Sequence, residues 1–377
     1  MINIHKKLIA SFLLFSACSI GIEAQKVVVG TYYFKKDGGE YTGELSRRKP
    51  HGKGVTKYNN GDTYEGEYVK GKRQGSGIYK HQNGEFYEGT WVQNQQHGFG
   101  TYYFLNNNKY VGLWYRDVKE GQGTMYYWNG DTYEGNWHND ERNGKGKYTF
   151  SNGVVYFGEW KNDKKHGFGI YDWQDGSRYE GHWVNNVRSG KGKYIYADGS
   201  RYVGNWVDGL MHGKGAFFSA NGDVYEGEYK NGKRTGAGVT TFASGDKYVG
   251  NYLEGEQHGT GTYTWNSKAE YKGEWKHNKC HGQGTYRWPN GDEYVGGWKD
   301  NLMHGDGTIT YADGTKFKGK FVDGRKHGDA VETDPKGKRL QCVYVDGERH
   351  GSFAEFDADG KLIAKGTYQL GQRKVEK

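Results

Sequence analysis

One unit of 23 residues is repeated along this chain without an insertion or deletion. The unit opens with an aromatic residue as Tyr-x-Gly-x-Trp/Tyr, continues through a polar loop to Gly-x-Gly-x-Tyr, and closes on Asn-Gly or Asp-Gly. Its leading aromatic residue recurs at Tyr41, Tyr64, Tyr87, Tyr110, Tyr133, Tyr156, Tyr179, Tyr202, Tyr225, Tyr248, Tyr271, Tyr294 and Phe317. A fixed period of this length is typical of a repeat array, in which each unit packs on its neighbours.

Residues two apart lie on the same face of a β-strand, so the spacing inside the unit predicts how its side chains divide. Tyr133, Gly135 and Trp137 share one face of a first strand, and Glu134 and Asn136 lie on the other. The matching face of the second strand carries Gly144, Gly146 and Tyr148. With 33 Tyr, 12 Trp and 64 Gly in the chain, we expect rings packed on glycine to replace an aliphatic core.

Asn-Gly and Asp-Gly pairs mark the turns, because a type I′ turn needs φ > 0 at both central residues. They occur at 60–61, 83–84, 129–130, 152–153, 175–176, 198–199, 221–222, 290–291 and 313–314. Each unit is therefore predicted to be a β-hairpin. The predicted fold is all-β: an elongated antiparallel meander of about 13 to 14 consecutive hairpins that forms a twisted ribbon or solenoid.

The unit resembles the membrane occupation and recognition nexus (MORN) repeat. The resemblance rests on Tyr-Glu-Gly-Glu-Tyr at 64–68 and 225–229, and on Tyr-Lys-Gly-Glu-Trp at 271–275 followed by His-Gly-Gln-Gly at 281–284. It implies a β-hairpin ribbon. In that family the repeats accompany phosphatidylinositol-phosphate kinases, junctophilins, some lysine methyltransferases and protozoan scaffolds. Little sequence lies outside the array at either end, so we expect no attached catalytic domain.

Four regions follow from this pattern: a signal peptide (1–24), an N-terminal half repeat or cap (25–40), the repeat array (41–339), and degenerate repeats with a C-terminal cap (340–377). Half a unit at 30–34 offers a strand to the first full repeat. Atypical ends are expected of a repeat array, because a terminal unit has one face without a neighbour.

Residues 1–24 have the pattern of an export signal. Lys6 and Lys7 form its positive start, an apolar run covers 8–22, and cleavage is expected before Gln25. The run is shorter than the roughly 20 residues that span a bilayer, so we do not expect a retained anchor helix. The protein is therefore expected outside the cytoplasm, in a periplasm, at a cell surface or secreted.

The cysteines add an alternative for the amino terminus. Phe-Ser-Ala-Cys at 15–18 resembles the site at which bacterial lipoproteins are cut and acylated, so Cys18 is a candidate for lipidation. Cys280 and Cys342 lie nearly three repeats apart, too far in a stacked array for a disulfide. We predict that both are free thiols.

Charge separates the two edges of the predicted ribbon. The turns carry acids at Asp62, Glu85, Asp131, Asp223, Asp246 and Asp292, whereas basic pairs occupy the opposite loops at Lys72, Arg73, Lys164, Lys165, Lys233, Arg234, Arg325 and Lys326. These loops are either simply solvated or form an electrostatic docking edge. The net charge of +8 is mild and no long basic run occurs, which argues against nucleic-acid binding.

No catalytic, metal or cofactor site is predicted. Nine histidines share one phase of the repeat, at His51, His97, His166, His212, His258, His281, His304, His327 and His350. Equivalent atoms in successive hairpins lie roughly 10 Å apart, whereas zinc ligands must reach within about 2.1 Å of the ion. The glycine pairs open strands and are not followed by a helix that could bind phosphate. We therefore expect a protein that is not an enzyme.

Three functions remain. The first is an exported scaffold that presents an extended surface to a protein or cell-envelope partner, with self-association possible. The second is peripheral binding to anionic phospholipid headgroups through the basic loops. The third is binding of surface glycans by aromatic rings.

Overall fold

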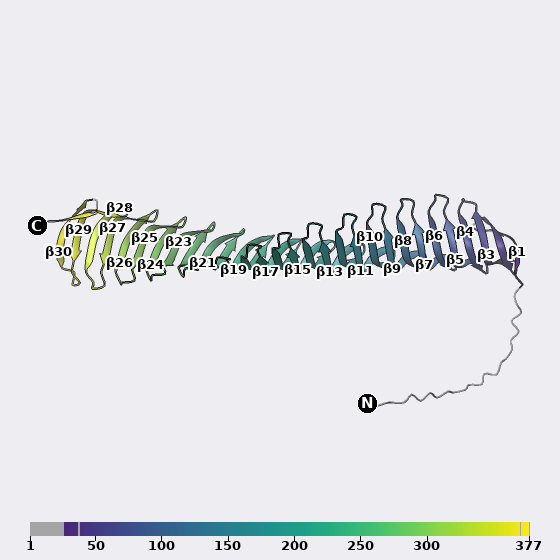
Figure 1. Ribbon diagram of the computed structural model, residues 1–377, viewed down its shortest axis with the longest axis horizontal. Helices are drawn as coiled ribbons and strands as arrows, with labels where there is room; N and C mark the ends of the chain where they lie inside the picture. The colour runs from purple at the N-terminus through teal and green to yellow at the C-terminus, as the bar shows by residue number, and fades with distance from the viewer. Residues whose placement is uncertain (1–25, 37, 370, 377) are drawn as a thin grey trace, which may run out of the picture. The chain divides into compact units, whose positions relative to one another are not determined.

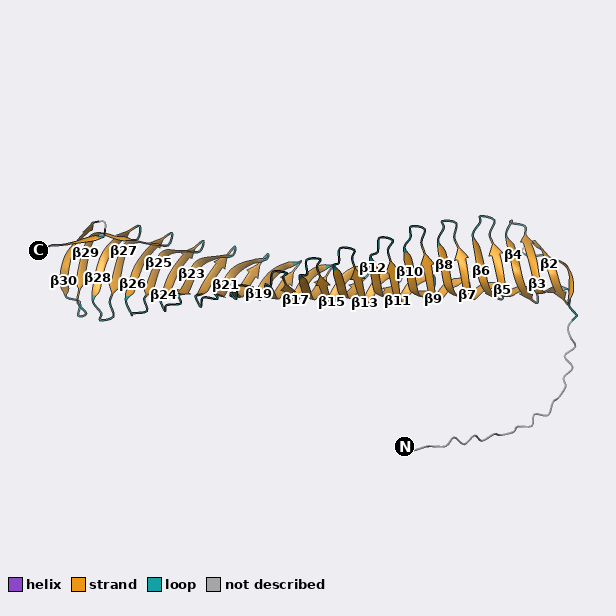
Figure 2. Cartoon of the chain, in the orientation of Figure 1, coloured by secondary structure: helices purple, strands orange, loops and turns teal. Residues whose placement is uncertain are grey.

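The computed structural model describes residues 26–36, 38–369 and 371–376. The predicted signal peptide and Cys18 lie outside these residues. The described residues form 31 β-strands joined by short turns, and no helix occurs among them (Figure 2). It follows that no helix in this part of the chain is suited to crossing a membrane.

The chain divides into two compact units, Met1–Val118 and Lys119–Lys377. The first unit contains β1 (Val28–Phe34), β2 (Gly39–Ser46), β3 (Lys49–Tyr58), β4 (Thr63–Val69), β5 (Lys72–Lys80), β6 (Phe86–Val92), β7 (Gln95–Tyr103) and β8 (Lys109–Tyr115).

The second unit contains the remaining strands, of which β9 begins one residue before the boundary. They are β9 (Val118–Tyr126), β10 (Thr132–His138), β11 (Glu141–Thr149), β12 (Val155–Lys161), β13 (Lys164–Asp172), β14 (Arg178–Val184), β15 (Val187–Ile195), β16 (Arg201–Val207), β17 (Leu210–Phe218), β18 (Val224–Lys230), β19 (Lys233–Thr241), β20 (Lys247–Leu253), β21 (Glu256–Thr264), β22 (Glu270–Lys276), β23 (Lys279–Arg287), β24 (Glu293–Lys299), β25 (Leu302–Thr310), β26 (Lys316–Val322), β27 (Arg325–Thr333), β28 (Arg339–Val345), β29 (Glu348–Phe356), β30 (Leu362–Gln369) and β31 (Gln372–Val375).

Within each unit the strands lie side by side in chain order, and neighbours pair antiparallel (Figure 1). In the pair β10–β11, Tyr133 lies opposite Tyr148 and Gly135 opposite Gly146. The predicted all-β meander of hairpins is confirmed. At the other end of that pair the register shifts between Gly135 and Trp137, so that each hairpin carries a β-bulge near its two-residue turn.

The turn assignment from sequence is wrong, because the Asn-Gly pairs do not form type I′ turns. At 58–62 only Gly61 has a positive φ (89°), and its N–H donates to the Tyr58 carbonyl at 3.0 Å. This is a type I turn closed by one left-handed residue. Asn60 has another task, since its Oδ1 accepts the N–H of Asp62 at 3.1 Å.

The type I′ geometry instead belongs to the two-residue turns at the opposite edge. In the turn after β4, φ is 52° at Lys70 and 83° at Gly71, and in the turn after β10 it is 47° at Asn139 and 68° at Asp140. Because these turns carry varied residues, no single pair of letters marks them in the sequence. A two-residue loop with this backbone twist matches the twist of the strands that it joins.

The core is built from rings on glycine, as predicted. A Cβ added to Gly135 would lie 2.7 Å from the Tyr133 hydroxyl, and one added to Gly146 would lie 2.5 Å from the Tyr133 ring. The leading tyrosines of the repeats are almost completely buried. Gly144 is an exception to the prediction: it contacts Asn136 on the other face, and its φ of +89° shows that the bulge requires glycine there.

Cys280 and Cys342 are buried and free, which confirms the prediction for both thiols. Burial raises the pKa of Cys280 to about 12 and that of Cys342 to about 11. A thiol reacts as its thiolate, so neither cysteine is poised for redox chemistry at neutral pH.

Candidate functional site

Each hairpin has two faces with different chemistry. The aromatic face carries the leading tyrosine and the tryptophan, for example Tyr133 and Trp137, which are buried. The open face carries the residues between them and their partners on the next strand, for example Glu134, Asn136 and Lys147. We keep these two names below.

The aromatic face is filled by its own rings. The centroid of Tyr133 lies 5.2 Å from that of Trp137 and 5.4 Å from that of Trp160 in the next repeat, and both contacts are edge-to-face. The polar atoms are also satisfied, since Tyr133 donates its hydroxyl to the Asn136 carbonyl at 2.9 Å and Trp160 Nε1 donates to the Gly146 carbonyl at 3.2 Å. This face is therefore the core of each hairpin.

The second residue of each predicted basic pair lies over this core. The guanidinium of Arg73 lies 4.3 Å from the centroid of Trp91, and Lys165 Nζ lies 4.6 Å from that of Trp183. Arg234 lies 5.2 Å from Tyr252, and Lys326 Nζ lies 4.1 Å from Phe317. These cation–π contacts give four of the eight candidate docking residues a packing role.

The first residue of each pair is exposed. Lys233 Nζ pairs with Glu254 at 2.7 Å, and Lys72 Nζ donates to Gln93 Oε1 at 2.5 Å. Lys164 and Arg325 are also exposed at the starts of β13 and β27. The four residues belong to separate hairpins, so they do not form one compact cluster.

Lys165 offers a test of this packing, because burial alone lowers its pKa from 10.5 to about 8. Below pH 8 the ammonium is charged in both the folded and the unfolded chain. Between pH 8 and 10.5 the folded chain loses this proton first, so the unfolded chain binds more protons and stability rises with pH. Measured by denaturant unfolding, the wild type should gain stability relative to Lys165→Met across this window.

Met is a suitable control at this position, because Met211 and Met303 occupy it in two other repeats. A constant difference between wild type and Lys165→Met from pH 7 to 10.5 would contradict a buried, desolvated ammonium.

The acidic turn residues connect neighbouring repeats. Each accepts a backbone N–H from the turn of the following repeat: Asp62 from Gln82, Glu85 from Leu105, Asp131 from Ser151, Asp223 from Ala243, Asp246 from Asn266 and Asp292 from Ala312. Asp131 also accepts the Tyr148 hydroxyl at 2.7 Å. Burial raises the pKa of Asp131, but these hydrogen bonds outweigh burial and leave the pKa below its usual range.

Sequence reasoning missed an equivalent connection at the two-residue turns. The N–H of Asp163 donates to the Arg142 carbonyl at 3.1 Å, and Asp163 Oδ1 accepts the Arg142 N–H at 3.0 Å. Asn186 and Lys165 make the same reciprocal pair, at 3.0 and 2.8 Å. The recurring Asn or Asp at this phase was a signal for the role.

The described residues contain no group of three His, Cys, Asp or Glu side chains placed to hold a metal ion. The nine histidines lie in nine different hairpins, each just before the glycine of the bulge, as His166 precedes Gly167 with its φ of +58°.

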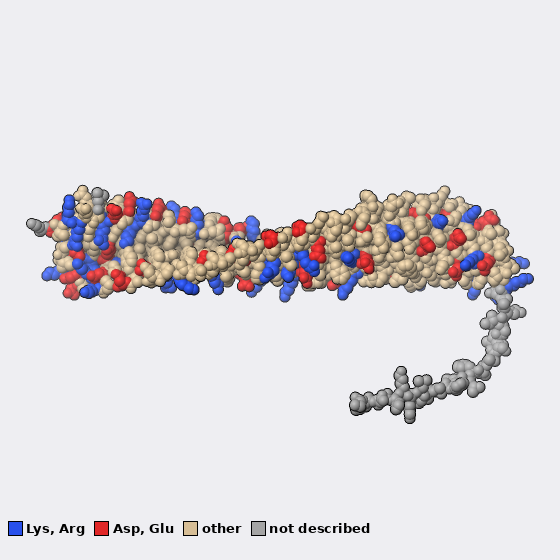
Figure 3. Space-filling view, viewed as in Figure 1, with Lys and Arg blue, Asp and Glu red and all other residues tan. Residues whose placement is uncertain are grey.

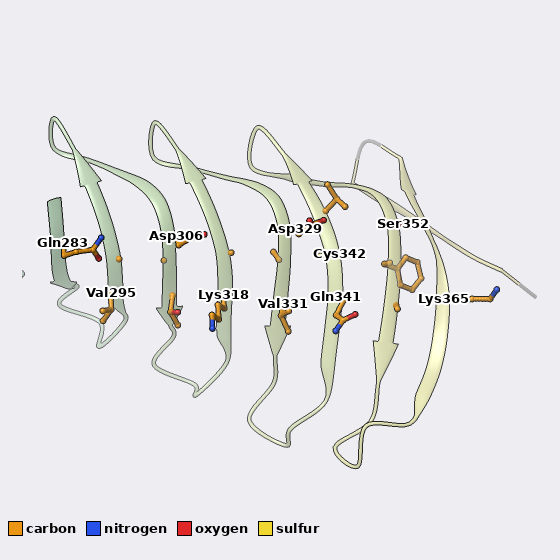
Figure 4. Close-up of a pocket in the computed structure, with 18 residues that line it drawn as sticks. Gln283, Val295, Asp306, Lys318, Asp329, Val331, Gln341, Cys342, Ser352 and Lys365 are labelled. Atoms are coloured by element: carbon orange, nitrogen blue, oxygen red, sulfur yellow. The ribbon is translucent and has the colours of Figure 1, made fainter. Parts of the chain in front are cut away.

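The open face is hollowed in both units. In the second unit one hollow of about 920 Å³ runs along β23 to β30, and Val295, Lys318, Val331 and Gln341 line it (Figure 4). Another of about 960 Å³ lies along β18 to β23, and the first unit has one of about 760 Å³ along β3 to β7. Paired glycines contribute backbone to each hollow, which leaves room above the sheet for a bound segment.

Charges of both signs are mixed on the surface. On the face visible in Figure 3, Lys and Arg side chains alternate with Asp and Glu instead of gathering in one patch of a single sign. The hollow along β23 to β30 is lined by Lys318 as well as by Asp306 and Asp329. Such a surface suits a partner with both polar and apolar groups.

A family model described as the MORN repeat matches 13 consecutive segments of the chain. They are residues 41–63, 64–86, 87–109, 110–132, 133–155, 156–178, 179–201, 202–224, 225–247, 248–269, 271–293, 294–316 and 317–339. Each segment begins at one of the leading aromatic residues. No curated protein has a sequence that matches this chain.

Several solved structures show a weak likeness to the chain. A mutant of the TCP10 domain of CPAP from Danio rerio is 13% identical, with 59% of this chain and 99% of that chain covered and a TM-score of 0.29. The TCP domain of SAS-4 from Drosophila melanogaster, solved with a proline-rich motif of Ana2, is 15% identical, with 41% and 85% covered and a TM-score of 0.27. A virginiamycin B lyase from Staphylococcus aureus is 10% identical, with 82% and 96% covered and a TM-score of 0.13. At TM-scores this low, these likenesses carry no argument about function.

Proposed function

The chain belongs to the MORN-repeat family, and from this premise we propose that it is an exported, non-catalytic scaffold whose open face binds a protein or cell-envelope partner. One observation carries the proposal: the two faces of each hairpin differ in what is left to bind. The aromatic face is occupied by its own rings and cations, whereas the open face is hollow and lined by mixed side chains. Because most rings lie in the core, few remain for a glycan.

Capture from the native cell-envelope fraction tests this proposal. Val249 and Val295 lie on the open face and are 46% and 49% exposed. Lys272, in the repeat between them, occupies the same position, so the strands accept lysine there. The double variant Val249→Lys, Val295→Lys should fold normally and lose the captured partner.

A matched control places the same change at the edge of the ribbon, where Val184 and Val207 are comparably exposed at the ends of β14 and β16. Val184→Lys, Val207→Lys should capture the partner as the wild type does. Equal capture by the wild type and the open-face variant would refute the assignment of the binding face.

Export is the second part of the proposal, and it rests on the charged start and apolar run at 1–24. Intact-mass measurement of the native protein should show a chain that begins at Gln25 or at an acylated Cys18. Replacing Cys18 by Ser separates the two cases, because it removes acylation and leaves cleavage before Gln25 unchanged. A chain recovered from the cytosol with Met1 in place would end the extracellular proposal.

Anionic lipid is the alternative partner. The four exposed cations favour only weak binding to it. A basic residue near an anionic surface contributes roughly 1 kcal/mol, and the attraction decays over about 8 Å at physiological salt. Unacylated protein should therefore cosediment weakly with anionic vesicles and not with neutral ones. Changing Lys72, Lys164, Lys233 and Arg325 to Ser should remove that binding.

The control changes the four inward-facing cations to Ser instead. Arg73, Lys165, Arg234 and Lys326 lie over rings and contribute less to a membrane contact, so this variant should lose less of the vesicle binding. Strong retention on vesicles at high salt, or binding that survives loss of the four exposed cations, would show that lipid is held by apolar insertion instead.

A further inference from the structure

On the aromatic face of the second unit, the row of rings is interrupted between Phe217 and Phe242. Rings at the start of each turn contact rings of the next repeat, with centroids 5.4 Å apart for Trp173 and Tyr194, 5.8 Å for Tyr196 and Phe217, and 5.6 Å for Phe242 and Tyr263. One such pair of positions lies between the last two pairs, and neither of its residues has a ring.

Ser219 and Thr240 occupy those two positions. A cavity of about 510 Å³ replaces the missing rings, and Phe217, Ser219, Thr240 and Phe242 line it together with Arg234 and Asp223. The gap therefore lies between two aromatic residues of the row and above two opposite charges.

Three charged residues line the cavity: Lys233 pairs with Glu254, whereas Asp223 and Arg234 lack the partners that Asp131 and Arg142 have in an earlier repeat. Asp131 and Asp246 accept tyrosine hydroxyls from Tyr148 and Tyr263 at 2.7 and 2.9 Å. In the repeat with the gap, Thr240 stands where that tyrosine would be, and it bonds to the Tyr252 hydroxyl instead, at 2.6 Å. Asp223 Oδ2 keeps only the amide of Asn221, at 3.1 Å, among the hydrogen bonds of the described residues.

Arg234 differs from Arg142 in a similar way. Arg142 Nε pairs with Asp163 at 2.8 Å, and Asp163 lies 21 residues further along the chain. The residue at that distance from Arg234 is Gly255, which has no side chain and also lines the cavity. The guanidinium thus keeps its ring contacts with Tyr225 and Tyr252 and faces the gap without a carboxylate from this turn.

We propose that this cavity binds a phenol ring, supplied as a tyrosine side chain of a partner polypeptide. The neighbouring repeats show the bound geometry: the ring would lie between Phe217 and Phe242, its face would meet the cation of Arg234, and its hydroxyl would donate to Asp223. The source of the ring rests on the proposed protein-binding function, whereas the pocket is independent of it. It lies on the opposite face from the hollows of the open face.

The pocket is tested with N-acetyl-tyrosinamide titrated into the full chain and followed by NMR. N-acetyl-phenylalaninamide is the matched ligand without a hydroxyl. We expect binding of the tyrosine compound with a Kd on the order of 1 mM, and weaker binding of the phenylalanine compound by about fivefold or more. Asp223→Asn should reduce this preference, because the carboxylate accepts the hydroxyl more strongly than an amide does.

Filling the gap gives the decisive variant. Thr240→Tyr combined with Tyr252→Trp rebuilds the arrangement of Tyr148 and Trp160, so it should raise the melting temperature and weaken binding more than about tenfold. Thr262→Tyr is the control, since it adds the same ring to the open face and should leave binding unchanged. Arg234→Met should also weaken binding, and Met211 and Met303 show that the fold accepts methionine there.

Equal binding of the two compounds, or tight binding to the filled variant, would overturn the pocket. Capture from the envelope fraction then tests the source of the ring. If the compounds bind but filling the gap leaves capture unchanged, the tyrosine does not come from the captured partner. That result would leave the open-face proposal intact. The open-face proposal fails only if Val249→Lys, Val295→Lys has no effect on capture of the partner.

Discussion

Gly135→Val is expected to disrupt the β10–β11 hairpin and to lower the free energy of unfolding by more than about 2 kcal/mol. The φ of Gly135 is not positive, so the cost comes from crowding and not from backbone strain. A Cβ at this position would collide with the Cα of Gly146 and would lie 2.7 Å from the Tyr133 hydroxyl. Neither neighbour is free to move, because the paired strands hold one and the surrounding rings hold the other. Denaturant unfolding measures the loss.

Glu134→Gln is the matched control, since Glu134 is exposed on the open face of the same strand and the change should cost almost nothing. The chain also contains a natural relaxation of this packing. In the repeat that begins at Phe317, Ala330 takes the place of the second glycine, and the ring has no hydroxyl to collide with its methyl group. Ala330 corresponds to Gly146, so adding Tyr133→Phe to Gly146→Ala should recover part of the stability that Gly146→Ala alone loses. Equal unfolding midpoints for Gly135→Val and Glu134→Gln would show that the strand faces are assigned wrongly.

Alkaline pH is expected to unfold the protein over a narrow range above about pH 10. Burial raises the pKa of Tyr179 and Tyr202 to about 12 from the usual value of 10, and the same cause acts on the leading tyrosines of the other repeats. Above pH 10 the unfolded chain loses these protons first. The folded chain then binds more protons, so stability present below pH 10 is lost as pH rises toward 12. Circular dichroism and tyrosinate absorbance should report one shared transition.

The control for this transition removes two ionisable groups without removing their rings. Phe317 shows that phenylalanine fits the leading position. Tyr179→Phe, Tyr202→Phe loses two hydroxyl bonds to the carbonyls of His182 and Asn205, so it should be less stable than the wild type at pH 7 by about 1 kcal/mol for each bond. Its alkaline midpoint should nevertheless be higher. Tyrosinate absorbance that grows before structure is lost would contradict buried, neutral tyrosines.

The fold was predictable because its determinants are local and repeated. The spacing of Tyr133, Gly135 and Trp137 is a period of two, and a period of two has one structural meaning in a short strand. The packing of the Tyr133 ring on Gly146 could be inferred from the same two-residue spacing in the second strand. The division of side chains between the two faces therefore followed without long-range information, except at the bulge, where Gly144 lies on the other face.

The turns and the candidate site were less predictable, for two physical reasons. A glycine after Asn signals a left-handed residue, but it does not say whether one or two residues adopt that conformation, so Asn60 was assigned the wrong backbone. The basic pairs resembled a solvated edge in sequence. Alternate residues of a strand point to opposite faces, which sends Lys164 outward and places Lys165 over Trp183.

The turn-to-turn hydrogen bonds have a consequence for how such a gene can change. Arg142 and Asp163 lie 21 residues apart, and Asp131 and Ser151 lie 20 apart, so each bond reaches only into the adjoining repeat. Unequal recombination that adds or removes 23 residues would join equivalent donors to equivalent acceptors at the new junction. The array can thus gain or lose whole repeats while the contacts between neighbouring repeats stay the same. Selection can then change the length of the array separately from the side chains on its surface.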